Sequence, residues 1–300
     1  MEPRAATGAH APPVDIELRA IEAVVPYLRA TVLDDPRTGD DDVAWHDCDA
    51  LLRDPLALRP LVDATAAGRG SDQAQVLASL FAQSYAFRVA SVAVAGWVLG
   101  RPVVSPAPEH TAIAVTRSRP GRLGLRMADA ADPTEPADPA TPVLLTGSDE
   151  LVLPVLVDRL VVRHLGGVIG ALRATTTIGA RLLWGDVVAS IVAVMRAVEG
   201  EVAPDRKPIV RARGEELLRA ADAAVEGGLA DLGAFVVLHA HDDEGWFWER
   251  TSCCLWYRST EAERAAERTG SPYCGDCSLV ATDDRRAAFV AGLGASGARS

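Results

Sequence analysis

The sequence of 300 residues is almost free of lysine and poor in sulfur. Lys207 is the only lysine, so arginine supplies nearly all of the positive charge, and there are five cysteines. The formal net charge is −11, and no local run of basic residues offsets it. Proteins that bind nucleic acid normally carry a basic patch. The composition therefore argues against nucleic-acid binding. A net acidic surface also favours cationic or neutral ligands over anionic ones.

Long uninterrupted apolar runs are missing as well. Val89–Gly100 is too short to cross a bilayer, and Leu151–Leu172 contains charged or titratable side chains between Asp158 and His164. The first fifteen residues lack the apolar centre of a secretion signal. We therefore expect no membrane span and a cytoplasmic location, where thiols stay reduced.

The apolar fraction of 49% is that of an ordinary globular protein. Ile16–Leu33 has helical spacing, and Pro26 is predicted to kink that helix or end it early. A second helix is predicted from near Ser71 to Gly100, a glycine closely followed by proline. Two short β-prone runs within Thr111–Met127 predict a hairpin.

The second half of the sequence is predicted to be mainly helical. Ser148 is a predicted N-cap, followed by acidic residues that suit the positive end of a helix dipole. Leu183–Val198 and Arg213–Val225 are predicted helices. Leu232–Ala240 has enough β-branched residues for a strand but is too short to assign.

These patterns predict an α+β protein, predominantly helical, with a small antiparallel β hairpin or sheet and a C-terminal cysteine-rich segment that binds a cluster. The predicted division is a disordered lead-in (1–15), a helical region with the hairpin (16–127), a linker or loop rich in proline and acid (128–142), a second helical region (143–245), the cluster-binding segment (246–281) and a tail (282–300).

Four of the five cysteines lie close together near the C-terminus. Cys253 and Cys254 are adjacent, and Cys274 and Cys277 form a CxxC motif. Four thiolates select zinc or an iron–sulfur cluster. Gly275 is expected to let the CxxC loop turn tightly. Adjacent cysteines point to opposite faces of an extended chain, so their joint use as ligands requires a local bend. From the residues alone, zinc and an iron–sulfur cluster both remain open.

Other interpretations of these thiols are weaker. A redox dithiol normally has its CxxC at a strand-to-helix junction of a βαβ pattern, and no such pattern surrounds Cys274. A disulfide between Cys253 and Cys254 would be strained. The four cysteines are therefore candidate metal ligands.

Four stretches of sequence resemble the FhuF-type ferric siderophore reductases. "SCCLWYR" (Ser252–Arg258) and "YCGDCSL" (Tyr273–Leu279) resemble the C-terminal cysteine motif of that family. "RLLWGDVVAS" (Arg181–Ser190) resembles its Trp-Gly-(Asn or Asp)-x-x-Ala-Ser helix, and "SYAFRVASVAVAGWVLG" (Ser84–Gly100) resembles a helix that carries aromatic residues and an arginine. The resemblance is sharp at the C-terminus and diffuse elsewhere.

The resemblance implies an oxidoreductase in which Cys253, Cys254, Cys274 and Cys277 hold a [2Fe–2S] cluster. Such an enzyme reduces siderophore-bound Fe(III) to Fe(II) by one electron and releases iron in the cytoplasm. The implied partners are a ferric siderophore, with hydroxamates among the candidates, and an unidentified electron donor. No residue is expected to act as a nucleophile or general base. Two alternatives stay open: a zinc-stabilised binding module, and an iron–sulfur electron-transfer protein of a biosynthetic pathway.

The sequence departs from the family pattern in one place. Nineteen residues separate Cys254 from Cys274, which is more than the family pattern has. Ser259–Arg268 within this insert is predicted to be a short exposed helix. The cost of closing a loop grows only logarithmically with its length, so the insert is compatible with the same ligands.

Several residues near the cysteines have ordinary interpretations. Asp276 is expected to disfavour addition of an electron to a cluster, whereas Arg250 and Arg258 are expected to be solvated or structural. Trp246–Trp248 is predicted to be core packing, with shielding of the cluster or a siderophore site as the alternative.

Four more residues are assigned no function. Cys48 is predicted to be a partly buried bystander, and Trp184 a core residue. His239 and His241 are predicted to be ordinary surface or strand-end residues rather than metal ligands.

Overall fold

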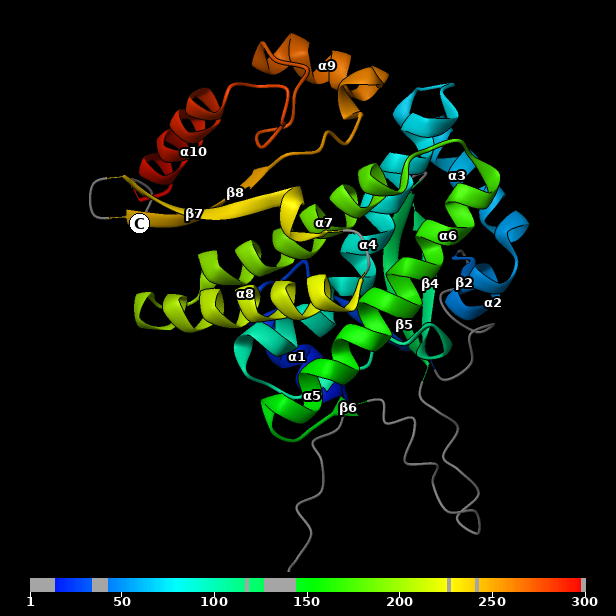
Figure 1. Cartoon of the computed structure of the whole chain (residues 1–300), viewed down its shortest axis with the longest axis horizontal. Helices are drawn as coiled ribbons and strands as arrows, with labels where there is room; N and C mark the ends of the chain where they lie inside the picture. Colours follow the sequence, from blue (N-terminus) through cyan, green and yellow to red (C-terminus); the bar gives the residue numbers. More distant parts are fainter. Residues whose placement is uncertain are drawn as a thin grey trace, which may run out of the picture.

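The computed structural model describes residues 14–33, 43–116, 119–126, 144–225, 228–240 and 243–297. The fold is α+β and predominantly helical, as predicted (Figure 1). The helices are α1 (Val14–Val24), α2 (Cys48–Arg53), α3 (Pro55–Arg69), α4 (Ala74–Leu99), α5 (Asp149–Val157), α6 (Gly166–Thr175), α7 (Ala180–Glu201), α8 (Lys207–Ala224), α9 (Thr260–Thr269) and α10 (Thr282–Gly297). The strands are β1 (Ala30–Leu33), β2 (Trp45–Asp47), β3 (Val103–Val104), β4 (Thr111–Thr116), β5 (Arg119–Arg126), β6 (Leu144–Leu145), β7 (Gly233–Ala240) and β8 (Asp243–Arg250).

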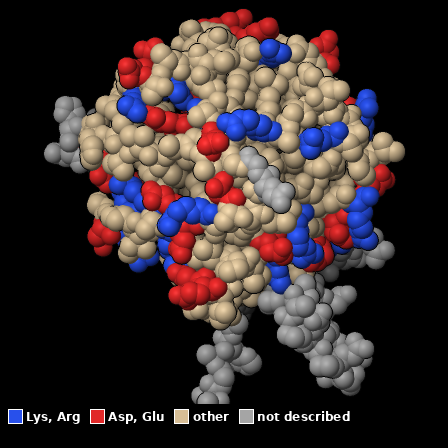
Figure 2. Space-filling view, viewed as in Figure 1, with Lys and Arg blue, Asp and Glu red and all other residues tan. Residues whose placement is uncertain are grey.

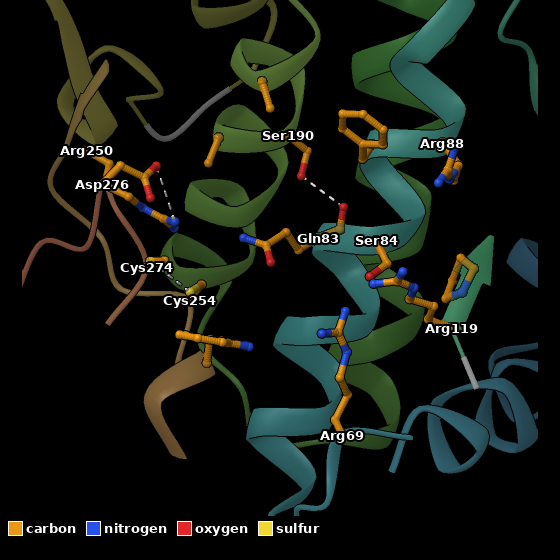
Figure 3. Close-up of a pocket in the computed structure, with 15 residues that line it drawn as sticks. Arg69, Gln83, Ser84, Arg88, Arg119, Ser190, Arg250, Cys254, Cys274 and Asp276 are labelled. Atoms are coloured by element: carbon orange, nitrogen blue, oxygen red, sulfur yellow. Dashed lines mark hydrogen bonds and ion pairs between the residues drawn. The ribbon is translucent and has the colours of Figure 1, made fainter. Parts of the chain in front are cut away.

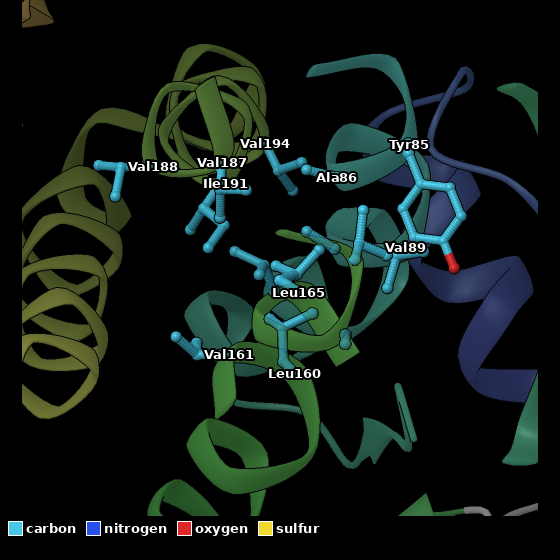
Figure 4. Packing of buried hydrophobic residues seen from close by; sticks show 14 of the residues in the cluster. Tyr85, Ala86, Val89, Leu160, Val161, Leu165, Val187, Val188, Ile191 and Val194 are labelled. Carbon is cyan, nitrogen blue, oxygen red and sulfur yellow. The ribbon is translucent and has the colours of Figure 1, made fainter. Parts of the chain in front are cut away.

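Helix α4 lies at the centre of the molecule. It is apolar on nearly every side, and most of its residues are buried. It ends at Gly100, which adopts the left-handed conformation that favours glycine. Tyr85 and Val89 of α4 face Leu165 of the π-helical segment η2 (Asp158–Leu165), and Ile191 of α7 packs on the same cluster (Figure 4).

Within the described ranges, α4 is the one helix long and apolar enough to cross a membrane. In this fold 78% of its most apolar window is buried. A helix that is hydrophobic all round is expected at the centre of a protein core as much as in a bilayer. The apolar side chains of α4 therefore pack in the protein core.

The predicted hairpin is present as β4 and β5, which pair antiparallel within a sheet of order β1-β5-β4-β2. The prediction for Ile16–Leu33 is correct only in its first half. Helix α1 ends at Val24, before Pro26, and Ala30–Leu33 forms strand β1, parallel to β5. The prediction failed there because the helical spacing of apolar residues continues through Ala30–Leu33, although pairing with β5 makes this segment an edge strand of the sheet.

The helices predicted in the second half are confirmed: α7 extends beyond both expected ends, and α8 begins six residues early and ends one residue before Val225. Ser148 stands at the N-cap of α5, and its side chain lowers the pKa of Glu150. Helix α8 begins at Lys207, whose ammonium group donates to the carbonyl of Glu244 at 3.2 Å. This contact ties α8 to β8.

The C-terminal part forms a layer of its own beside α7 (Figure 1). Leu232–Ala240 proves to be a strand, β7, which pairs with β8 in a hairpin. Within the segment 282–300, helix α10 extends through Gly297 and packs on this hairpin. The hairpin ends at Arg250, directly before the first cysteines.

Two predicted regions fall largely outside the described residues. The expected lead-in, 1–15, is described only at residues 14 and 15, which begin α1. The expected linker, 128–142, lies wholly outside the described ranges. The proposed division of the chain into segments therefore stays a prediction.

Candidate functional site

The loop after β8 contains the bend that adjacent cysteine ligands require. Leu255 has a φ of 57°, and it is the one non-glycine residue with positive φ among those described. Its N–H donates to Sγ of Cys253 at 3.4 Å. Positive φ is unfavourable for a branched side chain, so surrounding contacts must hold Leu255 there. The chain thereby turns away directly after Cys254.

The two cysteine motifs meet across the insert. Sγ of Cys254 lies 3.8 Å from Sγ of Cys274, and Cys253 interacts with Cys277. Cys254 and Cys277 are buried, whereas Cys253 and Cys274 are partly exposed. Each contact joins one member of the adjacent pair to one member of the CxxC motif.

The thiols are close enough to share protons. The pKa of Cys254 is lowered, first by a hydrogen bond from Cys274, and the pKa of Cys277 is lowered, first by a hydrogen bond from Cys253. The pKa values of Cys253 and Cys274 are raised by the same hydrogen bonds. The lowered pKa values of Cys254 and Cys277 favour the thiolate, which is the form that binds a metal.

The expected role of Gly275 is not borne out. The CxxC segment turns through hydrogen bonds from the N–H of Cys277 to the carbonyl of Cys274 and from Val280 to the carbonyl of Cys277, each 3.0 Å. Gly275 does not have positive φ, and a Cβ added there would meet nothing within 4 Å. The turn therefore does not depend on glycine at this position.

The donor set fits a metal-bound sulfur group in two respects. A tetrahedral ion with metal–sulfur bonds of about 2.3 Å holds two thiolates about 3.8 Å apart, which is the separation of Cys254 and Cys274. In addition, Nε of Arg250, Oγ of Ser252 and Nε of Arg285 are buried and have no hydrogen-bond partner among the described residues. Such donors need acceptors, and thiolate or sulfide sulfur accepts hydrogen bonds. As the thiols stand, no group of three or more His, Cys, Asp or Glu side chains in the described ranges encloses a single ion.

A buried polar chain supports the cysteine loop from behind. Ser79 Oγ lies 2.5 Å from Oδ2 of Asp186 and 2.7 Å from the carbonyl oxygen of Cys254. The hydroxyl of Ser79 therefore links the carboxyl of Asp186 to the backbone of the cysteine loop. Burial raises the pKa of Asp186 well above its usual range.

Arg250 has the structural rather than the solvated role of the two expected from the sequence. It is 2% exposed, and its Nη2 lies 3.4 Å from Oδ1 of Asp186, while its Nη1 lies 4.0 Å from Asp276. Burial alone would lower the pKa of Arg250, but Asp276 and the Cys254 thiolate outweigh this and raise it. Arg250 thus places a permanent positive charge beside the cysteines.

The Trp-Gly-Asp motif of α7 is the surface on which the cysteine loop rests. A Cβ at Gly185 would lie 1.9 Å from Oγ of Ser252, so only glycine allows this approach. Ser190 donates to the carbonyl of Asp186 at 2.8 Å and lies 2.9 Å from the carbonyl of Gln83 on α4. Trp184 is partly buried against the core, as predicted. The spacing of this motif is therefore explained by close packing rather than by chemistry at the tryptophan.

A pocket of about 480 Å³ opens beside the cysteines. Cys254 and Cys274 lie at one side, and Arg69, Arg88 and Arg119 approach from the other (Figure 3). The remaining lining residues are Gln83, Ser84, Phe87, Pro120, Ala189, Ser190, Ala193, Arg250, Trp256 and Asp276.

Sequence reasoning does not identify this pocket. Arg88 and Trp256 fall within stretches that resemble the family, but the sequence assigns neither a role. Arg69 and Arg119 come from the end of α3 and the start of β5. They meet α4 and the cysteine loop only in the folded chain, so no local signal could reveal them.

The insert between the cysteine pairs is a helix, as predicted, but it is anchored rather than free. Helix α9 begins after Ser259, whose hydroxyl accepts from the N–H of Ala262. Thr260 binds the carbonyl of Gly70 through both its N–H and its hydroxyl, and Glu261 pairs with Arg69. Helix α9 therefore borders the pocket at the end of α3.

The residues predicted to be ordinary are mostly so. Cys48 is fully buried, and burial raises its pKa to about 11. His239 is largely exposed near Glu244, and His241 lies outside the described residues. Arg258 is exposed and donates to Tyr257.

The aromatic triplet belongs to the core of the C-terminal layer. Trp246 stacks on Phe235 with ring centroids 3.5 Å apart, and Trp248 meets the same ring edge-on. Phe247 points to the opposite face, toward Phe289 of α10. None of the three lines the pocket beside the cysteines, whereas Trp256 does.

Comparison with known proteins supports the resemblance. The family model described as "Ferric iron reductase FhuF-like transporter" matches residues 79–230, just over half of the 300-residue chain. No curated protein matches the chain. The matched region begins at Ser79, includes Arg88 and Asp186, and ends before the four cysteines. The chain therefore belongs to the FhuF-like ferric iron reductase family.

Proposed function

We propose that this protein reduces siderophore-bound Fe(III) by one electron, through a [2Fe–2S] cluster held by Cys253, Cys254, Cys274 and Cys277, and releases iron in the cytoplasm. Membership of the family supports siderophore-iron reduction in general. The observation that carries the proposal is that two of the cysteines, Cys254 and Cys274, form part of the wall of a pocket of about 480 Å³. Pockets of this size bind small molecules.

The chemistry of the four thiolates agrees with this reaction. A [2Fe–2S] cluster in such a site supplies one electron at a time, and Fe(II) is held by oxygen chelators far less tightly than Fe(III). The protein's own part is to hold the cysteines, to place Arg250 against their charge and to seat the chelate beside Cys254 and Cys274. None of these steps requires a proton to be removed from the substrate.

The first experiment is a metal analysis of protein purified without oxygen. We expect a red-brown protein containing iron and acid-labile sulfide in equal amounts, and we expect Cys254→Ser to lose both. Cys48→Ala is the matched control, because Cys48 is buried away from the pocket, and it should retain the colour. A colourless, zinc-loaded protein that cannot be reconstituted would instead support the zinc-stabilised module.

The second experiment tests the reaction. The reduced protein is mixed with a ferric hydroxamate under argon, with an Fe(II) chelator present as a trap. We expect the absorbance of the oxidised protein to return as the Fe(II) complex forms. An iron–sulfur protein that serves another pathway would stay reduced in this mixture.

A further inference from the structure

The positive charge of the pocket is concentrated on the wall opposite the cysteines. Four arginines and one aspartate line the pocket. Two of the arginines have acidic partners: Arg250 lies between Asp186 and Asp276, and Arg69 pairs with Glu261. Asp276 is on the cysteine side, so among the described residues no acidic side chain lines the wall formed by α4 and β5 (Figure 3).

Arg88 and Arg119 are the two lining arginines without an acidic partner in the described part of the chain. Neither forms an ion pair with any residue the structure describes. Arg88 donates to the carbonyl of Tyr27 at 3.4 Å, and its guanidinium carbon lies 5.4 Å from the centre of the Phe87 ring. Burial lowers the pKa of Arg88, and the nearby charge of Arg119 lowers it further.

Two like charges held together beside a cavity destabilise the empty pocket, and an anion between them relieves the repulsion. Arginine also binds carboxylates through paired N–H groups, which a neutral chelate cannot use. The net charge of −11 does not oppose this. Acidic and basic side chains are intermixed over the face shown in Figure 2, so the charge within the pocket is set locally.

We propose that the substrate of this pocket is a ferric chelate of net negative charge, whose peripheral carboxylate or phenolate oxygens bind Arg88 and Arg119. The inference rests on the proposed reductase function and specifies its substrate class. It reverses the expectation from net charge, which favoured cationic or neutral siderophores. A chelate bound to Arg88 and Arg119 would have its anionic side turned away from Asp276 and the thiolates, which lie on the opposite side of the pocket.

Binding is tested with chromium(III) complexes, which exchange ligands slowly and are hard to reduce. The probes are the tris-oxalate complex, a trianion, and the neutral tris-acetohydroxamate complex, which is of similar size. Calorimetry on the holoprotein should show the trianion binding at least tenfold more tightly at low salt. Added salt should weaken the binding of the trianion but not that of the neutral complex.

The arginines are tested one at a time. We expect Arg88→Gln to weaken trianion binding about tenfold, which is typical for the loss of a charged hydrogen bond. Arg119→Gln should weaken it several-fold, since Arg119 is exposed and its charge is screened. Arg119→Lys should restore most of the loss, and the exposed Arg19→Gln should change nothing. The inference would be overturned if the trianionic and neutral complexes bound with equal affinity. It would also be overturned if the arginine variants weakened the binding of both complexes equally.

The ferric forms of the same complexes separate this inference from the function on which it rests. If the neutral ferric complex reoxidises the reduced protein while the trianion neither binds nor reacts, the substrate class is wrong and the reductase stands. If neither ferric complex reoxidises the protein, the reductase function itself fails. Faster reoxidation by the trianion, slowed by Arg88→Gln, supports both.

Discussion

At the scale of single residues, the site depends on charged residues whose partners are not evident from the sequence motifs that contain them. Asp276 stands between two candidate ligands in the sequence, and the structure adds that it faces Arg250 across 4.0 Å. Asp186 belongs to a family motif, and in the structure it accepts hydrogen bonds from Arg250 and from Ser79. Both residues act on the cysteines without being ligands.

The carboxylate of Asp276 should lower the reduction potential of the site. Replacing Asp276 with Asn removes a negative charge near the thiolates, so the potential should rise by on the order of 50 mV. Asp283→Asn is the matched control, because Asp283 is exposed in the first turn of α10. The measurement is a redox titration of both variants, and an unchanged or lower potential for Asp276→Asn would contradict the prediction.

Asp186 should tolerate asparagine but not alanine. Asparagine has nearly the shape of aspartate, and its amide can still accept from Arg250 and bond to the Ser79 hydroxyl, so Asp186→Asn should cost less than about 1.5 kcal/mol of unfolding free energy. Asp186→Ala leaves Arg250 without this acceptor in a buried site, and losses of about 3 to 5 kcal/mol are typical of such broken pairs. Urea unfolding of the two variants checks the difference; similar losses in both would show that the hydrogen bonds of Asp186 are unimportant.

At the scale of elements, α7 supports the cysteine loop by close contact. Gly185 meets Ser252 where a side chain has no room, whereas Gly200, in the same helix, has open space around it. The two glycines therefore form a matched pair.

We expect Gly185→Ala to displace the loop, to reduce cluster retention and to cost about 1 to 3 kcal/mol. Gly200→Ala should stabilise the protein by up to about 1 kcal/mol, because alanine is the better helix former. Thermal unfolding and iron content measure both effects. Adding Ser252→Gly to Gly185→Ala should restore iron binding, and a double variant as poor as the single one would count against this contact.

The elements also show what local sequence can predict. The four cysteines and helices α4, α7 and α9 were predicted because their signals are contained within single segments. Strand β1 was missed because its sequence continued a helical period, and only pairing with β5 makes it a strand. The pocket was missed for a similar reason, since Arg69, Gln83, Arg119 and Trp256 come from four separate elements.

At the scale of the whole molecule, stability depends on a buried polar group that is separate from the Asp186 network behind the cysteine loop. His164 of the π-helical segment is fully buried, with Nε2 2.8 Å from the hydroxyl of Tyr85 and Nδ1 2.6 Å from the carbonyl of Pro106. Burial lowers the pKa of His164 to about 4. The ring is therefore neutral in the folded protein, although it would be protonated below about pH 6.5 in an unfolded chain.

Stability should decrease on acidification for this reason. Because the folded pKa is depressed, the unfolded state binds more protons between about pH 6.5 and pH 4, and stability falls as the pH falls through that window by up to about 3 kcal/mol. Urea unfolding at pH 7.5 and pH 5 measures the change. His164→Gln should be less stable at pH 7.5 but should show a smaller loss between the two values; an equal loss would mean that other groups cause it.

The near absence of lysine has a practical consequence for measuring this protein. Amine coupling can attach the chain only through its amino terminus and through Lys207, at the start of α8. Lys207 is not among the residues that line the pocket beside the cysteines, so coupling at Lys207 would leave that pocket open. Molecules joined at Lys207 to an amine-reactive electrode would share one orientation, and their current would report electron transfer without a soluble donor.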